Sequence, residues 1–499
     1  MATKRLRTTM LLLAAALAVA WGQLPGPQGA VPKKLVNLNV VALDNHDEPV
    51  TDLTTADLQV TDAGKPQPIV FFRHNDERLQ PQSTLAAGEF SNRVGVRQAH
   101  PTVILFDRFN DSIGPSAAAM NELGHALEKM EAGGGDLYLY FLTKQMKLYP
   151  VRPLPGADSA TAKPLPDTWT HEGRSLIEAA NNATFGLRTP GLDEGQLIIQ
   201  TYQAVANMAA QMAELPGRKN IIWITHGVPI VIRDVGGQPF DFTPYLRRLC
   251  AELDRANVAL YPVQLTPPGM AMSSQPEAAH SGLGSAETLD QFAQLTGGRA
   301  NANGDFGNVI RQAMIDARTS YQIAYEPPDT NWDGKFHKLR VTTKRKGVKL
   351  QSKTGYYAWA GQAADEQEAV GAVVGSPADA AEIGLKVTAA RSSTDPLLVH
   401  FKARIEGGDV AILQEGGQYT TALSLTVAAY NDQGQVQAGK MIPLDLKLTA
   451  AERDQALKAG ITYDKDVRLG APVRKVRVLV LDSRLGTAGS VTIPVERIK

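Results

Sequence analysis

The chain has almost no cysteine, no net charge and, after its first residues, no long apolar run. Cys250 is the single cysteine among 499 residues, which excludes an internal disulfide. Lys plus Arg and Asp plus Glu each number 51, so no overall field attracts nucleic acid, and we expect no nucleic-acid partner. No later stretch approaches the roughly 20 apolar residues of a membrane-spanning helix. The mature chain is therefore predicted to lack a transmembrane segment.

The local motifs of common enzymes are also absent. The sequence contains no Gly-x-Ser-x-Gly elbow, no His-Glu-x-x-His, no phosphate-binding Gly-x-x-x-x-Gly-Lys-Ser/Thr and no Cys-x-x-Cys. These absences favour a protein that is not an enzyme. A catalytic triad dispersed along the chain would leave no local motif, so an extracytoplasmic hydrolase stays open as an alternative.

Residues 1–23 have the pattern of a secretory signal peptide. Lys4, Arg5 and Arg7 precede an apolar run from Met10 to Trp21, and small residues follow. The run is too short to span a bilayer. We predict a secreted or periplasmic protein, with retention of the signal as an anchor as the alternative.

Strand and helix patterns divide the rest of the chain. Short β-type runs with turn residues between them occupy its beginning and its end. From about residue 100, apolar strands such as "TVILFD" and "KNIIWIT" alternate with amphipathic helices, one of them at about 194–215. This alternation predicts a doubly wound, mostly parallel sheet with helices on both faces. The predicted parts are an N-terminal β segment (33–98), an α/β domain (99–318), a β segment that pairs with the first (319–358), a linker or loose helix (359–383) and a C-terminal, Ig-like β-sandwich (384–499).

A cluster of polar side chains follows the first strand of the predicted α/β domain. The apolar run "TVILF" ends at Asp107, and Asn110, Asp111 and Ser112 come directly after it. Open parallel sheets bind ligands beyond the carboxyl ends of their strands, so this cluster is the predicted ligand site. A Rossmann-type nucleotide site would need a glycine-rich turn here, and no glycine precedes Gly114.

Several longer segments carry a family resemblance. The order "TVILFD", "GRKNIIWITHG", "LDRANVALYPVQL", "LTGGRA" and "WDGKFHKLRVTTKRKGVKLQSKTGYYA" resembles the VWFA-related family of secreted proteins of the acidobacterial type. The resemblance covers about residues 35–358, and the C-terminal part is similar to that family's appended β domain. It implies a von Willebrand factor A-like α/β domain inserted in a β-sandwich, with a second β-sandwich after it.

The resemblance also implies a function. It suggests a binding protein that recognises a protein partner, or adheres to it, at the cell envelope or outside the cell. A structural envelope scaffold without a ligand-binding site is the alternative.

Ligand-binding members of the von Willebrand factor A type hold a divalent cation in a metal-ion-dependent adhesion site. The resemblance places Asp107 at the first position of its Asp-x-Ser-x-Ser loop, but Phe109 and Asp111 occupy the serine positions. The turn after the fourth strand reads Thr225-His226 where an aspartate is expected. The site is therefore degenerate.

The candidate residues follow from this comparison. Asp107 and Asp111 are the metal-ligand candidates, for Mg²⁺ or Mn²⁺, or for Zn²⁺ if His226 takes part. An adhesion-type site also takes a threonine ligand from a second loop, and Thr184 and Thr189 are the candidates for that position. The alternative is that Asp107 caps the following turn or pairs with Arg108 or His226. The ligand-binding candidates are Asp107, Asn110, Asp111, Ser112, Thr225 and His226.

Two further segments have open interpretations. Residues 335–353 hold eight Lys or Arg and no acidic residue, which suits a patch for an acidic polysaccharide or lipid headgroup. The interpretation we favour is an exposed strand pair whose lysines prevent edge-to-edge aggregation. The loop 266–285, with Met270, Met272 and His280, contacts a partner or packs back on the chain.

Overall fold

The computed structural model separates the chain into two units, Met1–Val31 and Pro32–Lys499. The predicted signal peptide lies outside the described residues, as does the loop 266–284. The described residues are 34–498 except for 77–84, 94–99, 111–112, 131–135, 155–168, 170–172, 185–192, 214, 216, 229, 234–237, 266–284, 302–304, 329–331, 359–364, 377 and 471–472.

Two four-stranded sheets enclose the first core. Their orders are β15-β1-β13-β4 and β16-β14-β2-β3. Leu38 and Ile323 from one sheet pack against Val60 and Leu339 from the other, because alternate residues of each strand are apolar. The strands are β1 (Val36–Leu43), β2 (Leu58–Asp62), β3 (Lys65–Gln67), β4 (Phe71–Asp76), β13 (Thr319–Tyr325), β14 (Phe336–Thr343), β15 (Lys349–Gln351) and β16 (Gly355–Tyr357), with a short 3-10 helix at Thr55–Asp57.

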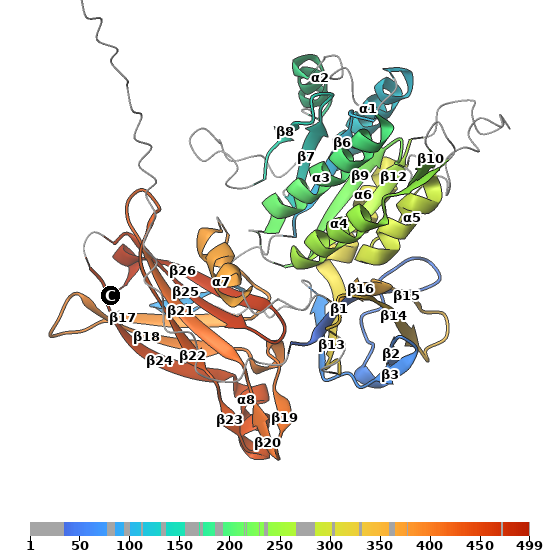
Figure 1. The fold of residues 1–499 in the computed structure, drawn as a ribbon. Helices are drawn as coiled ribbons and strands as arrows, with labels where there is room; N and C mark the ends of the chain where they lie inside the picture. The colour runs from blue at the N-terminus through green and yellow to red at the C-terminus, as the bar shows by residue number, and fades with distance from the viewer. Residues whose placement is uncertain are drawn as a thin grey trace, which may run out of the picture. The chain divides into compact units, whose positions relative to one another are not determined.

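A mixed five-stranded sheet of order β12-β9-β6-β7-β8 forms the α/β region, between β4 and β13 in the chain (Figure 1). Strands β6, β7, β9 and β12 are parallel, and the edge strand β8 is antiparallel to β7. The fold is thus of the mixed α/β type with a mostly parallel sheet, as predicted. The strands are β6 (Thr102–Asp107), β7 (Leu137–Leu142), β8 (Leu148–Arg152), β9 (Lys219–Thr225) and β12 (Val258–Gln264).

Helices cover both faces of this sheet, because successive residues of each buried strand point to opposite sides. Val103 and Leu105 of β6 pack with the helices of one face, and Ile104 and Phe106 with those of the other. The first face is covered by α3 (Glu194–Ala213), α4 (Thr243–Arg255) and α5 (Ser285–Thr296), and the second by α1 (Ile113–Glu128), α2 (Gly173–Ala183) and α6 (Phe306–Arg318).

The C-terminal region contains two four-stranded sheets of orders β24-β18-β17-β5 and β22-β21-β25-β26 around one core. A three-stranded sheet, β19-β20-β23, and a helix, α8 (Ala450–Ala459), complete it. The bounds are β17 (Leu385–Arg391), β18 (Leu398–Ile405), β19 (Leu413–Glu415), β20 (Gln418–Thr420), β21 (Leu423–Tyr430), β22 (Val436–Leu444), β23 (Lys447–Leu448), β24 (Ile461–Arg468), β25 (Lys475–Asp482) and β26 (Thr487–Pro494), with 3-10 helices at Gly407–Asp409 and Val495–Arg497.

One strand differs from the sequence prediction. Strand β5 (Glu89–Ser91) lies within 33–98 but pairs with β17, because Phe90 joins the C-terminal core and the Asn92 side chain binds the backbone of Ala380 and Ile383. The segment 359–383, predicted as a linker or a loose helix, contains the helix α7 (Asp365–Gly375), whose apolar side packs beside β25. In the described part of the chain, no helix is long and apolar enough to cross a membrane.

A buried carboxylate ties the first β region to the C-terminal region. Asp409 lies 3.4 Å from Arg73, on β4, and 2.9 Å from Arg93, which follows β5. It also accepts a hydrogen bond of 2.8 Å from the backbone N–H of Gly384. Burial lowers the pKa of Arg73, and the charge of Asp409 opposes this effect. If the two regions separated, Arg73 would lose this carboxylate, whereas Arg93, next to β5 of the C-terminal sheet, would keep it.

We therefore expect Asp409→Ala to destabilise the fold by about 3–5 kcal/mol, because it leaves the largely buried guanidinium of Arg73 and the partly exposed one of Arg93 without their carboxylate. The matched control is Asp395→Ala, which removes the more exposed pair with Arg468 and should cost about 0–1 kcal/mol. Urea denaturation measures both variants. Equal losses in the two variants would show that the buried triad has no special role.

Candidate functional site

Asp107 closes β6 at the carboxyl edge of the α/β sheet and is 0% exposed. Its Oδ1 accepts the backbone N–H groups of Phe109 at 3.0 Å and Asn110 at 3.1 Å. Its Oδ2 accepts the Asn110 side-chain amide and the Thr225 hydroxyl, each at 2.7 Å. The capping role considered for Asp107 is confirmed by the two backbone contacts.

The network extends from Asp107 into two neighbouring elements. The Asn110 amide also donates to the hydroxyl of Thr201, on α3, at 2.9 Å, and Thr201 in turn donates to the Leu197 carbonyl at 2.8 Å. The Thr225 hydroxyl accepts the Gly227 N–H at 3.1 Å. Burial raises the pKa of Asp107, while the bonds from Asn110 and Thr225 act in the opposite direction. One carboxylate therefore fixes the loop after β6 to α3 and β9.

The structure brings together only part of the predicted set. Asp107, Asn110 and Thr225 share one network, whereas the half-buried His226 is not among the four donors to Asp107. Thr184 accepts a hydrogen bond of 2.8 Å from the Arg108 guanidinium. The candidates Asp111, Ser112 and Thr189 lie outside the described residues.

The described residues do not fit an adhesion-type metal site. Both oxygens of Asp107 already face N–H or O–H donors, and Asn110 directs its amide nitrogen, not its oxygen, toward them. Phe109, at the first serine position, is buried in the core beneath α3 and α4. Throughout the described ranges, no three His, Cys, Asp or Glu side chains gather in a way that could hold a metal ion. The loop is thus organised by hydrogen bonds.

Exposed aromatic side chains lie near the same edge of the sheet. A hairpin of β10 (Val231–Arg233) and β11 (Pro239–Asp241) follows β9 and leads into α4. Because β9 and β12 are parallel, α4 runs back from the carboxyl edge, and its first turn lies there. Phe240 is 51% exposed and Tyr245 is 38% exposed, and the ring of the buried Phe242 lies between them, at 4.7 Å and 6.0 Å.

Sequence reasoning missed both Thr201 and these rings. Thr201 is a polar residue within a largely apolar helix, which is a weak signal for a buried hydrogen bond. Phe240 precedes a helix start in a polar segment, and only its exposure distinguishes it from a core residue.

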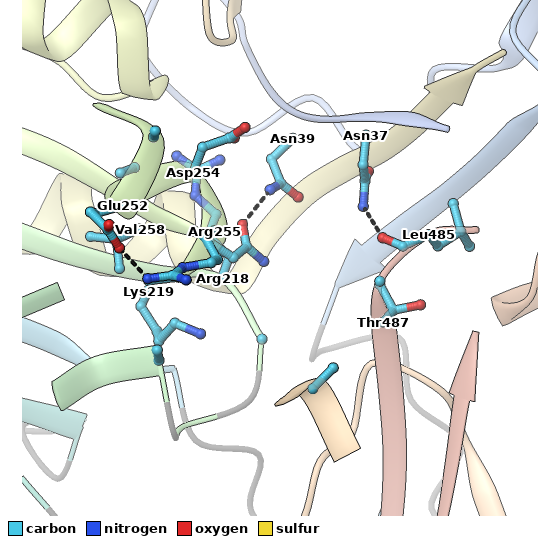
Figure 2. A pocket seen from close by; sticks show the side chains of 18 of the residues that line it. Asn37, Asn39, Arg218, Lys219, Glu252, Asp254, Arg255, Val258, Leu485 and Thr487 are labelled. Carbon is cyan, nitrogen blue, oxygen red and sulfur yellow. Dashed lines mark hydrogen bonds and ion pairs between the residues drawn. The ribbon is translucent and has the colours of Figure 1, made fainter. Parts of the chain in front are cut away.

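A pocket of about 460 Å³ lies away from this edge (Figure 2). It is lined by β1, the start of β9, the end of α4 and the turn before β26, and many of its polar groups are paired. Asn39 binds Asn257 at 2.9 Å, Asn37 binds the Leu485 carbonyl at 3.4 Å, and Arg255 pairs with Glu252. These contacts join segments of the chain instead of converging on a ligand.

Lys219 is the unusual charged group of this pocket. It is buried at the start of β9, and its Nζ donates to the Leu215 carbonyl at 2.6 Å, just beyond the end of α3. Burial lowers the pKa of its ammonium to about 8, and Glu382 opposes this effect. The contact with a carbonyl near the helix end gives Lys219 a structural role.

The chain matches no protein-family model and no curated protein. Among solved structures, the pilus adhesin SpaC from Lactobacillus rhamnosus GG aligns with a TM-score of 0.25 and 9% identity over 87% of this chain. This chain spans 58% of the length of that adhesin. An endonuclease/exonuclease/phosphatase from Beutenbergia cavernae aligns with a TM-score of 0.13 and 10% identity, over 36% of this chain and 38% of the other. At these scores neither likeness bears on fold or function.

We expect Asp107→Asn to destabilise the chain by about 1–3 kcal/mol. The substitution replaces one carboxylate oxygen with an NH₂ group, and in either orientation of the amide this group faces hydrogen-bond donors instead of acceptors. The matched control is Asp305→Asn, at the start of α6, where the side chain accepts the Asn308 N–H and no other hydrogen bond from a described residue, and asparagine caps equally well. Denaturant unfolding compares the two. A stable Asp107→Asn protein would contradict the four-donor network.

We expect the Lys219→Met variant to be more stable than the parent at pH 7, by about 1–3 kcal/mol. Burial makes the charged form of the Lys219 side chain less favourable in the folded protein than in the unfolded chain, and methionine carries no charge. Between pH 8 and the ordinary lysine pKa of 10.5 the unfolded chain binds the proton more tightly, so the parent gains stability as pH rises and the difference shrinks. Unfolding free energies at pH 7, 8, 9 and 10 measure it, with the exposed Lys458→Met as control. If the stability difference between Lys219→Met and the parent did not change with pH, the lowered pKa of Lys219 would be contradicted.

Proposed function

We propose that the chain is a secreted, non-enzymatic binding protein of the VWFA-related type. It recognises a protein partner at the cell envelope or outside the cell, through the carboxyl edge of its α/β sheet. Recognition at this edge needs no resident metal ion.

The sheet supports this proposal. A mostly parallel sheet with helices on both faces is the architecture that the family resemblance implies, and β6 ends at the edge where such sheets bind ligands. The chain enters the α/β region at the amino end of β6 and leaves it through α6 into β13. The carboxyl edge therefore lies at the far end of the strand from the point of entry.

The exposed rings of Phe240 and Tyr245 carry the proposal. Aromatic side chains are enriched at protein interfaces, and the residues that dominate binding energy are often Tyr, Trp or Phe. Both rings stand beside the buried Phe242, which anchors them to the core. Rings that already pack against a buried side chain have less conformational entropy to lose when a partner covers them.

The Asp107 network supports recognition without a metal. In an adhesion-type site the ion supplies the open coordination position for a carboxylate of the partner. Here the two carboxylate oxygens are filled by Phe109, Asn110 and Thr225. To expose Asp107 to an ion, the loop would have to give up four hydrogen bonds.

The test is selection of peptide ligands by the purified chain from a displayed random library, in buffer with Mg²⁺. We expect the selected peptides to bind at least about tenfold more weakly to the double variant Phe240→Ala/Tyr245→Ala, because the rings supply the contact area. Their affinity should be the same with Mg²⁺ or with EDTA. Calorimetry measures each affinity.

The matched control is Phe336→Ala, which removes a ring that is 39% exposed on β14, in the first β region and away from the carboxyl edge. It should leave the affinity within about twofold of the parent value. Peptides that bind the double variant and the parent equally would refute recognition at this edge. Loss of binding in EDTA would refute its metal independence.

A further inference from the structure

Tertiary contacts sort the eight cations of residues 335–353 into two groups of four. Four of them form ion pairs with acidic residues, three of which come from other parts of the chain. The pairs are Lys335 with Asp333 at 3.4 Å, Arg345 with Asp52 at 2.6 Å, Lys349 with Asp47 at 3.7 Å and Lys353 with Asp254 at 2.6 Å. Local neutralisation accounts for these four.

The other four cations are Lys338, Arg340, Lys344 and Lys346. All four are exposed, and none forms an ion pair or a side-chain hydrogen bond with a described residue. Like charges on neighbouring positions of a sheet repel one another. The fold therefore keeps an uncompensated positive row.

Lys338 and Arg340 lie on one face of β14, since Leu339 between them is buried on the other. Their cross-strand neighbours are Gly355 and Thr61. Neither neighbour carries a charge. Asp62, the acidic residue of β2, is buried on the opposite face, where it accepts a hydrogen bond from Tyr325 at 2.8 Å.

Protection of a sheet edge does not explain the row. Strand β14 lies inside the sheet, with β16 on one side and β2 on the other. Both of its edges are hydrogen-bonded along part of their length. Lysines that prevent edge-to-edge pairing are expected on an unpaired edge strand. The interpretation favoured from the sequence is therefore wrong for Lys338 and Arg340.

An aromatic pair stands at the start of the row. Phe336 is 39% exposed, and its ring centroid lies 5.0 Å from that of Tyr357 on β16. The Phe336 ring covers Gly355, where an added Cβ would lie 2.1 Å from the ring. The face thus begins with an aromatic surface and continues as cations.

We propose that this face binds an acidic polysaccharide. Lys338, Arg340 and Lys344 extend along about 20 Å of chain at ~3.3 Å per residue, which suits a linear polymer with repeated negative charges. The Phe336 ring suits the apolar C–H face of a sugar. A membrane surface would favour a two-dimensional basic patch. This surface belongs to the β region, so the inference is independent of the carboxyl edge proposed above.

The test uses the full chain with polygalacturonate and heparin as probes, neutral dextran as the uncharged probe and phosphatidylglycerol-containing vesicles as the lipid probe. We expect binding to both acidic polymers, weakened by salt, and no binding to dextran. In the row variant we expect at least a tenfold loss of affinity for both acidic polymers. The row variant is Lys338→Gln, Arg340→Gln, Lys344→Gln and Lys346→Gln.

The control variant removes the same charge from four scattered, exposed lysines and should lose less than about threefold. Circular dichroism checks that both variants fold. Equal losses in the two variants would overturn the proposal, since a general charge effect would explain binding. Binding to vesicles without binding to either acidic polymer, or no binding to either class of probe, would also overturn it. The control substitutions are Lys129→Gln, Lys402→Gln, Lys447→Gln and Lys458→Gln.

Discussion

The pairing of β1 with β13 is the constraint on which the rest of the structure depends. It joins Val36 to Tyr325 and Val40 to Tyr321, so that the whole α/β region lies between its two strands in the chain. The entropy of closing so long a loop grows only slowly with its length, and the apolar core around β1 and β13 offsets it. Helix α6 ends at Arg318 and β13 begins at Thr319, so the α/β region is held at its exit without a flexible linker.

Within that frame, Asp107 organises the start of the loop after β6. A buried carboxylate is costly unless its oxygens are hydrogen-bonded, and four donors from the loop itself and from β9 meet this requirement. The Asn110 amide carries the network on to Thr201, so one carboxylate connects β6, β9 and α3 at the carboxyl edge of the sheet.

The sequence predicted the elements that have a strong period and missed those defined by distant partners. The buried strand at 102–107 and the helix that starts at Glu194 are continuous apolar or amphipathic patterns, and both are present. Strand β5 is three residues long, and its partner β17 lies almost three hundred residues later, so no local pattern could assign it. The same limit applied to Asp107. From the sequence, it could cap the following turn or pair with Arg108 or His226, and its side-chain partner Thr225 was not foreseen.

The charged residues show most clearly that contacts between residues distant in the sequence cannot be predicted from a local pattern. Zero net charge and a run of eight cations are both properties of the sequence, yet neither describes a surface. Asp52, Asp47 and Asp254 come from other elements and neutralise three of the eight, which no reading of 335–353 alone could show. What remains is a group of four cations that form no ion pair with a described residue: Lys338 and Arg340 on β14, and Lys344 and Lys346 in the bend and turn after it. A repulsive row that the fold neither pairs nor requires is better explained by a ligand than by stability.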